Sequence, residues 1–348
     1  MNSALAATIG LILSIILIIK KVSPVYSLIL GALIGGLLAG WGLENTVTEM
    51  ISGIKDITPA IIRILAAGVL TGMLVKTGAA SSISHAIIKK LGAKQIYLAL
   101  ALSAMLLTAI GVFIDVAVIT IAPIALIAGS QLKLSRTKLL VAMIGGGKCG
   151  NIISPNPNSI IAAENFGAPL PSVMAANILP AIIGLLFTIY IIVPLLPKGN
   201  ILQPTEQVEE NKLLPSLWSS VIAPIVTILL LTLRPLFGII IDPLVALSAG
   251  GIVGIIATHN WNKTNECLSY GLGKMSTIAI LLIGTGALAG VIKASTIKDI
   301  LIELLAGWSN GGTIMAPLSG ALMCAATAST TAGATIASAS FAQSILGA

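Results

Sequence analysis

The run Gly145-Gly-Gly-Lys-Cys-Gly-Asn-Ile-Ile-Ser-Pro-Asn-Pro-Asn158 decides how this chain folds, because it is polar, rich in helix-breaking residues and flanked by apolar sequence. The flanking apolar segments, 137–144 and 159–166, are each only about two helical turns long. A helix needs roughly 20 residues to cross a membrane, so neither segment spans alone. Joined, they make one span with a break near mid-membrane. Broken backbone at that depth is tolerated only where it is buried in protein or lines a cavity, so the run indicates a binding site.

The composition excludes a soluble globular protein. Of 348 residues, 56% are hydrophobic and only 9% are charged, whereas soluble domains carry about 25% charged residues. The 35 glycines and the aromatic content of 4% favour helices that pack closely through small residues. The sequence therefore predicts an all-α, multi-pass protein of the cytoplasmic membrane, surrounded by the lipid bilayer.

The net charge of +7 does not indicate nucleic-acid binding, because the basic residues lie in short loops between apolar segments. Such a distribution is typical of the positive-inside rule, which orients membrane proteins. The three cysteines are far apart and have no neighbouring histidine, so we expect no disulfide, metal site or cofactor. The basic residues that set the orientation are Lys20, Lys21, Lys89, Lys90, Lys94, Lys133, Arg136 and Lys138.

Ten apolar segments define the predicted helices. Segment 81–91, which lies between two of them, has the amphipathic pattern of a helix in the membrane interface. Residues 95–129 are too long for one span and have basic residues at both ends, which predicts a re-entrant or full hairpin with Asp115 near its turn. The predicted segments are 4–19, 25–40, 57–75, 95–128, 137–166, 172–196, 217–233, 243–257, 275–292 and 313–347.

An internal duplication divides the chain into a first transmembrane repeat at 1–197, a cytoplasmic linker at 198–216 and a second repeat at 217–348. The crossings place the start of the first repeat outside and its end inside, so the second has the opposite orientation, as in the inverted repeats of secondary transporters. The partner of the broken segment would lie beyond Ala348, so we expect an incomplete second repeat and a truncated chain. At an offset of 218 (286 − 68), the matched glycines are Gly53, Gly68 and Gly72 with Gly271, Gly286 and Gly290.

Three stretches resemble the gluconate permease family, within the wider ion-transporter superfamily. They are TAIGVFIDVAVITIAPIALIAG (108–129), GGGKCGNIISPNPNSIIAAENFGAPLPSVMAANILPAIIG (145–184) and ATASTTAGATIASASFA (326–342). The resemblance implies proton symport of gluconate or related small hydroxy or amino acids. It also implies two inverted repeats, each with a re-entrant hairpin and a discontinuous helix. Family members usually continue past the position of Ala348.

Polar residues of the run are the predicted substrate site. Asn158 and Ser159 begin the second half-helix, where Asn is a favoured N-cap and the free N–H groups attract a carboxylate. The predicted break also contains polar side chains that can bond the hydroxyls or carboxylate of a small organic anion: those of Asn151, Ser154 and Asn156. The alternative is an ordinary loop at the membrane surface.

Three further groups complete the candidate site, each with an alternative. Lys148 either binds the anion, pairs with Asp115, or extends to the cytoplasmic interface. Asp115 is the first candidate for proton coupling, because burial raises the pKa of a carboxyl, and its alternative is a cap at the hairpin turn. Glu164 is the second candidate, or is simply solvated, and Arg63 reaches either an interface or a carboxylate. A hydroxyl cluster at the second hairpin either binds substrate or bonds helix backbone: Thr327, Ser329, Thr330 and Thr331.

The function that these features favour is proton-coupled uptake of a small organic anion such as gluconate. A sodium or inorganic-anion transporter of the same superfamily is the alternative within transport, and it would need more acidic residues at the breaks. A truncated, non-transporting membrane protein is the third hypothesis. An enzyme is not expected, since no nucleophile, base or metal constellation occurs among so few polar residues. A homodimer is left open.

Overall fold

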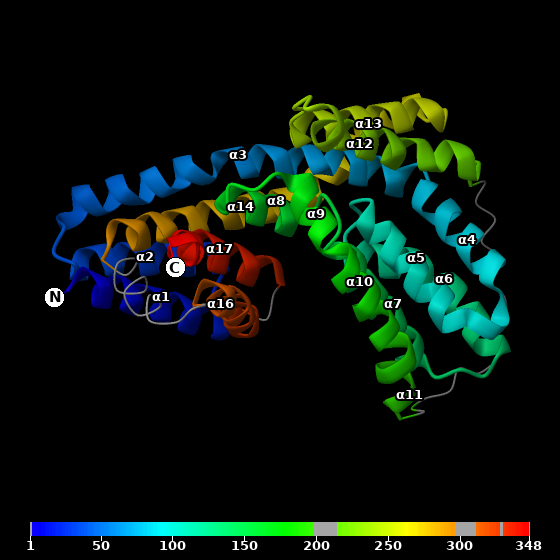
Figure 1. The fold of residues 1–348 in the computed structure, drawn as a ribbon, viewed down its shortest axis with the longest axis horizontal. Coiled ribbons are helices and arrows are strands. Elements are labelled where there is room, and N and C mark those ends of the chain that lie inside the picture. The colour runs from blue at the N-terminus through cyan, green and yellow to red at the C-terminus, as the bar shows by residue number, and fades with distance from the viewer. Residues whose placement is uncertain (1, 198, 200–213, 297–310, 328–329, 348) are drawn as a thin grey trace. The chain divides into compact units, whose positions relative to one another are not determined.

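Helices make up nearly all of the secondary structure in the computed structural model, which describes residues 2–197, 199, 214–296, 311–327 and 330–347 (Figure 1). The all-α prediction is therefore confirmed. Short 3₁₀ turns precede α5 and α14, at Ala93–Gln95 and Trp261–Lys263, and a π-helical turn at Thr188–Ile192 joins α10 to α11. The helices are α1 (Ser3–Ile19), α2 (Pro24–Leu38), α3 (Gly42–Lys76), α4 (Ala79–Leu91), α5 (Ile96–Ala109), α6 (Ile114–Gln131), α7 (Arg136–Asn151), α8 (Pro157–Asn165), α9 (Leu170–Ala176), α10 (Ile178–Phe187), α11 (Val193–Leu195), α12 (Leu217–Phe237), α13 (Pro243–Ala257), α14 (Thr264–Ala294), α16 (Gly311–Thr327) and α17 (Thr330–Gly347).

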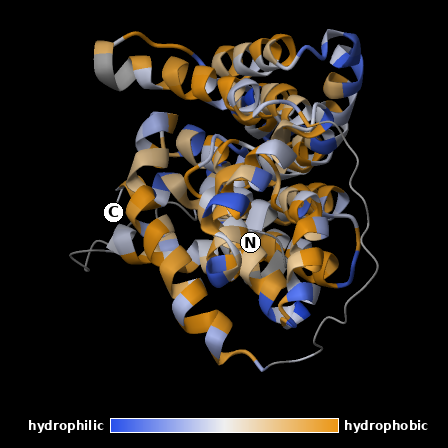
Figure 2. Cartoon of the chain, turned by 90° about the vertical axis from the view of Figure 1, so that its right-hand side faces the viewer, coloured by the Kyte–Doolittle hydropathy of each residue, from blue (hydrophilic) through white to orange (hydrophobic). Residues whose placement is uncertain are grey.

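The length and composition of these helices suit a bilayer. Within the described residues, four helical stretches are long and apolar enough to cross one: Gly42–Lys76, Ile114–Gln131, Leu170–Leu195 and Trp261–Ala294. Figure 2 shows hydrophobic residues along most of the length of the helices. Many large apolar side chains point outward, as Leu179 and Phe187 do on α10. Such an exterior is unfavourable in water and favourable against lipid.

The two longest helices extend beyond the apolar segments from which they were predicted. Helix α3 begins at Gly42 and α14 at Thr264, whereas the sequence predicted spans at 57–75 and 275–292. The predicted limits were wrong because polar residues that border an apolar window still continue the helix. The hydroxyls of Thr46 and Thr48 donate to carbonyl oxygens one turn earlier in α3, so these residues fit a helix.

The chain forms two compact units. Unit 1 comprises residues 1–64, 160–169 and 276–348, and its described core contains apolar side chains of α1, α2, α14 and α17. In this unit Gly53 of α3 lies against the backbone of α14 at Gly286 and Gly290. A Cβ at Gly53 would collide with that backbone, so these two helices approach closely only because glycine is present.

Unit 2 comprises residues 65–159 and 170–275. Its helices α5 and α6 form the predicted hairpin, and α4 is bent by 107° from the helix that follows it. In this unit Gly271 of α14 lies against the backbone of α3 at Gly68, and close to Gly72. This pairing repeats the one in unit 1 at the 218-residue offset, which favours the predicted duplication. The inverted repeats themselves remain a prediction.

Candidate functional site

The break in the discontinuous helix is shorter than the sequence predicted. Helix α7 continues through the glycine-rich part of the run to Asn151, and α8 begins at Pro157, so only residues 152–156 are non-helical. The glycines are helical because α7 packs tightly on α5 there. A Cβ at Gly146 would collide with the carbonyl of Ala101, and one at Gly150 with the carbonyl of Met105. Helix packing therefore outweighs the low helix propensity of glycine.

Asn156 connects the two half-helices. Its side-chain oxygen accepts the backbone N–H groups of Asn158 at 2.8 Å and Ser159 at 3.2 Å. Its side-chain nitrogen donates to the Oδ1 atom of Asn151 at 2.7 Å and also to the Asn151 carbonyl. The N-cap of α8 is therefore Asn156, and the prediction that Asn158 caps this helix was wrong. Pro157 takes the first helical position, which needs no donor, and this moves the cap two residues earlier.

The polar residues of the break and of the first turn of α8 are largely buried, whereas Ile152 at the start of the break is 39% exposed. Ser154 is 0% exposed, Asn156 4% and Ser159 5%, which argues against a loop at the membrane surface. Within the described part of the chain, the Ser154 hydroxyl and the side-chain oxygen of Asn158 are buried without a hydrogen-bond partner. Such atoms cost free energy unless they bind water or a ligand. The break thus has buried polar atoms able to bond a small polar ligand, beside the positive end of the α8 dipole, while the N–H groups of Asn158 and Ser159 are bonded to Asn156.

The first charged candidate, Asp115, lies in unit 2 in the first turn of α6, directly after the hairpin turn. Its carboxylate is 3.1 Å from the ammonium of Lys274 on α14, and its side chain is 57% exposed, not buried as the sequence predicted. The sequence did not identify Lys274 as a candidate. Lys148 lies in the last turn of α7 and its side chain is exposed, whereas its neighbours Gly147 and Cys149 are buried.

The second charged candidate, Glu164, lies in unit 1 near the end of α8. It forms an ion pair with Arg63 of α3, and the two side chains are 27% and 25% exposed. Of the two alternatives considered for Arg63, the structure therefore shows the one in which it reaches a carboxylate. Glu164 is correspondingly paired rather than simply solvated.

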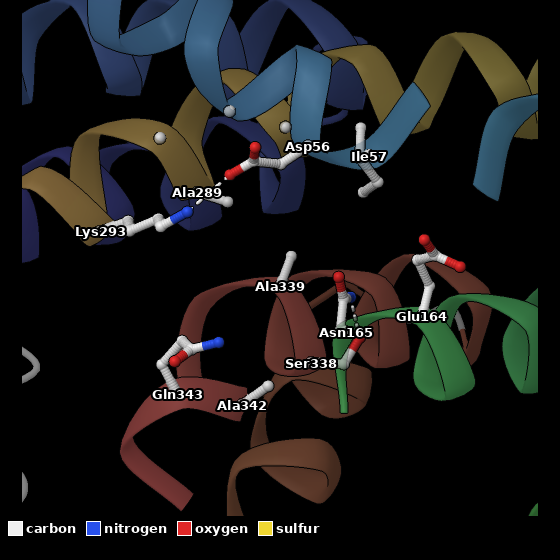
Figure 3. A pocket seen from close by; sticks show the side chains of 13 residues that line it. Asp56, Ile57, Glu164, Asn165, Ala289, Lys293, Ser338, Ala339, Ala342 and Gln343 are labelled. Atoms are coloured by element: carbon white, nitrogen blue, oxygen red, sulfur yellow. Dashed lines mark hydrogen bonds and ion pairs between the residues drawn. The ribbon is translucent and has the colours of Figure 1, made fainter. Parts of the chain in front are cut away.

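Glu164 also lines a cavity of about 180 Å³ in unit 1, formed by α3, α8, α14 and α17 (Figure 3). One wall carries the ion pair between Asp56 and Lys293, whose charged atoms are 2.7 Å apart. On the opposite wall the Asn165 amide donates to the Ser338 hydroxyl at 2.9 Å. Sequence reasoning missed these four residues. For Asp56 a signal existed, because the 218-residue offset matches it to Lys274, and each charge directly precedes an apolar segment.

The hydroxyl cluster is only partly described. Ser329 and the side chain of Thr327 lie outside the described residues. Thr330 begins α17, and its carbonyl accepts a hydrogen bond from the Cys324 thiol at 3.7 Å. The carbonyl of Thr331 accepts one from the Thr335 hydroxyl at 2.6 Å. In the described part of the chain, no three His, Cys, Asp or Glu side chains are grouped to hold a metal ion.

The sequence profile of the GntP family permease matches residues 3–348. The chain is 50% identical to an uncharacterized transporter of Haemophilus influenzae over 345 residues, which cover 99% of this chain and 82% of that protein. It is 24% identical to the gluconate permease of Pseudomonas aeruginosa, covering 94% of this chain and 78% of that one. It is also 24% identical to the Gnt-II system L-idonate transporter of Escherichia coli, covering 92% of this chain and 76% of the other.

A solved structure has a similar fold. The YdaH transporter of Alcanivorax borkumensis superposes with a TM-score of 0.59 over 88% of this chain and 73% of its own. The two sequences are 14% identical. This likeness concerns the fold alone.

Proposed function

This chain belongs to the GntP permease family, and from that membership we propose that it takes up gluconate or a related small sugar acid or hydroxy acid together with a proton. The family makes it a multi-pass transporter of the inner membrane, of the gluconate-permease kind. The substrate and the coupling ion are the proposed part.

The observation that carries the proposal is the buried break between α7 and α8. The N-terminus of α8 has about half a positive charge, which favours the carboxylate of a sugar acid, while its N–H groups at Asn158 and Ser159 are bonded to the Asn156 side chain. The unpaired Ser154 hydroxyl and Asn158 side-chain oxygen suit the hydroxyls of such a substrate. Asn151 and Ser159 flank these atoms and complete the proposed binding residues, with Lys148 as a second source of positive charge.

Proton coupling is assigned to Asp115, with Glu164 as the second carboxylate. A carboxylate among apolar helices is costly unless it has a partner, and such residues commonly serve proton transfer in transporters. Both acids have a basic partner, Lys274 and Arg63 respectively. The hydroxyl cluster of Thr327, Ser329, Thr330 and Thr331 is kept as a separate proposal for substrate binding.

The test is a proton-flux assay with the purified protein in liposomes that contain a pH-sensitive dye. Gluconate added outside should acidify the interior, and a sodium gradient should have no effect on uptake. Asn151→Ala, Asn158→Ala and Asp115→Asn should each lower uptake, while Lys20→Gln, far from these residues in sequence, should leave it unchanged.

Each contrary result has a distinct meaning. Gluconate uptake without acidification would contradict the proposal that a proton is the coupling ion. Dependence of uptake on a sodium gradient would favour sodium as the coupling ion. Unchanged uptake in all three variants would contradict the assignment of these residues to the substrate and proton sites. No uptake of gluconate, L-idonate or another small sugar or hydroxy acid would favour the non-transporting alternative.

A further inference from the structure

We propose that Lys274 is a positioning residue that holds the turn of the α5–α6 hairpin on α14 through Asp115, and that loss of the Asp115 charge releases this turn. The role of Asp115 as the proton acceptor rests on the proposed function. The position of the turn does not, and it is tested separately below.

The hairpin turn, residues 110–113, is fixed from two helices of the same unit. The hydroxyl of Thr71 on α3 donates to the carbonyl of Gly111 at 2.8 Å. The ammonium of Lys274 on α14 donates to the Oδ2 atom of Asp115 at 3.1 Å, two residues after the turn. The Thr71 bond is neutral and does not respond to protonation. The Lys274–Asp115 pair depends on both charges, so it is the contact that a proton can switch.

Lys274 is the end of a charge cluster on one face of α14. Glu266, Tyr270 and Lys274 follow one another at intervals of four residues, so their side chains lie along one face of the helix. The ammonium of Lys76 on α3 is 2.9 Å from Glu266 and 5.1 Å from the centre of the Tyr270 ring. The ammonium of Lys274 is 6.0 Å from the centre of the same ring.

This arrangement restrains the Lys274 side chain. A lysine has a flexible stem, and holding it in one orientation costs conformational entropy. Contact with the Tyr270 ring directs the ammonium through a cation–π interaction. In this cluster Lys76 pairs with Glu266 and Lys274 pairs with Asp115, while Lys263 adds a third positive charge near Glu266. Asp115 is therefore the partner that balances Lys274.

The surroundings make the charge balance matter. Asp115 lies in the first turn of the apolar helix α6, and Lys274 directly precedes the apolar segment 275–292; their side chains are 57% and 36% exposed. Helix α6 also packs against α4, α5 and α7, whose titratable or charged side chains are His85, Lys89, Lys90, Tyr97, Arg136, Lys138, Lys148 and Cys149. These elements carry no acid within their bounds, so the balancing carboxylate must come from α6 itself.

The pair gives a reason for proton and anion to move together. When a proton binds to the Asp115 carboxylate, the acid becomes neutral and Lys274 keeps its positive charge. No covalent bond other than the new O–H bond changes. Lys274 is then an unbalanced cation near Lys76, and the carboxylate of an entering substrate restores neutrality. The uncompensated charge of Lys274 therefore favours anion binding in the same state in which the hairpin turn is released.

The position of the turn is tested by maleimide labelling of Phe113→Cys in protein whose Cys149, Cys267 and Cys324 are alanine. We expect slow labelling with Lys274 present and labelling at least several-fold faster in Lys274→Gln and in Asp115→Asn. Lys274→Arg should remain slow, and the exchanged pair Asp115→Lys with Lys274→Asp should be slow again. Lys20→Gln is the matched control and should not change the rate. Ile110→Cys is a second labelling position if Phe113→Cys lowers the yield of folded protein.

Two results would overturn the inference: an unchanged rate in Lys274→Gln, or an exchanged pair that labels as fast as the single variants. A second experiment, in liposomes, measures how many protons the protein moves with each gluconate. Lys274→Gln should lower coupled uptake at least tenfold, and Lys274→Arg should recover most of it. If the unsubstituted protein moves protons with gluconate and Lys274→Gln does so equally well, the inference fails and the proposed function stands. If the unsubstituted protein moves no gluconate, the proposed function fails, and the labelling rates still decide the role of Lys274.

Discussion

Asn156 is the single residue on which the geometry of the break depends. It caps α8 and bonds Asn151 at the end of α7. Loss of a capping side chain costs roughly 0.5 to 2 kcal/mol. We expect Asn156→Ala to lower the thermal unfolding temperature in detergent and also to reduce uptake. Asn158→Ala removes no cap, so it should reduce uptake with little change in unfolding temperature. Equal unfolding temperatures for the two variants would contradict the assignment of the cap.

We expect the ion pair between Arg63 and Glu164 in unit 1 to contribute to the stability of the protein. Both side chains are about three-quarters buried, so removing either one leaves the other charge poorly compensated. We expect Arg63→Gln and Glu164→Gln each to lower the free energy of unfolding. The double variant should lose less free energy of unfolding than the sum of the two single losses. Residues in direct contact typically show a coupling of about 0.5 to 3 kcal/mol. A double-mutant cycle from thermal denaturation measures it, and additive losses would mean that the pair contributes no stability.

At the scale of elements, the contact between α5 and α7 depends on glycine. A Cβ at Gly146 meets the backbone of Ala101, which cannot move aside as a flexible side chain would. We expect Gly146→Ala to destabilise the protein by roughly 1 to 3 kcal/mol, as overpacking does. Gly320 in α16 has open space at its Cβ position. Gly320→Ala is therefore the control, and it should be neutral or stabilising by up to about 1 kcal/mol. Melting curves of both variants check the prediction.

The same contact explains where element prediction from sequence succeeded and where it did not. The hairpin 95–129 was predicted from its length and flanking charges, and α5 and α6 form it. The glycine-rich start of the run was read as a break, because glycine alone disfavours a helix. In the protein those glycines are helical, since they allow α7 to approach α5. Local propensity does not contain that information.

At the scale of the whole molecule, the duplication and its orientation make a prediction for the linker 198–216. We expect this linker to be cytoplasmic and the N-terminus to be outside. Alkaline phosphatase inserted at position 205 should be inactive, because the enzyme requires the periplasm, and a green fluorescent protein inserted there should fluoresce. A phosphatase fused before Met1 should be active. Phosphatase that is active both at position 205 and before Met1 would contradict the inverted orientation of the two repeats.

The class of the protein follows from composition and apolar segment length, because these decide whether a chain enters a membrane. The sequence also located the discontinuous helix and the hairpin, since breaks and flanking charges are local patterns. Which residues meet could not be predicted in this way, because it depends on the packing of the helices. The pairing of Asp115 with Lys274 joins positions 159 residues apart, and that of Arg63 with Glu164 joins positions 101 residues apart. Ion pairs depend on distance in space, and that distance is fixed by how the helices pack.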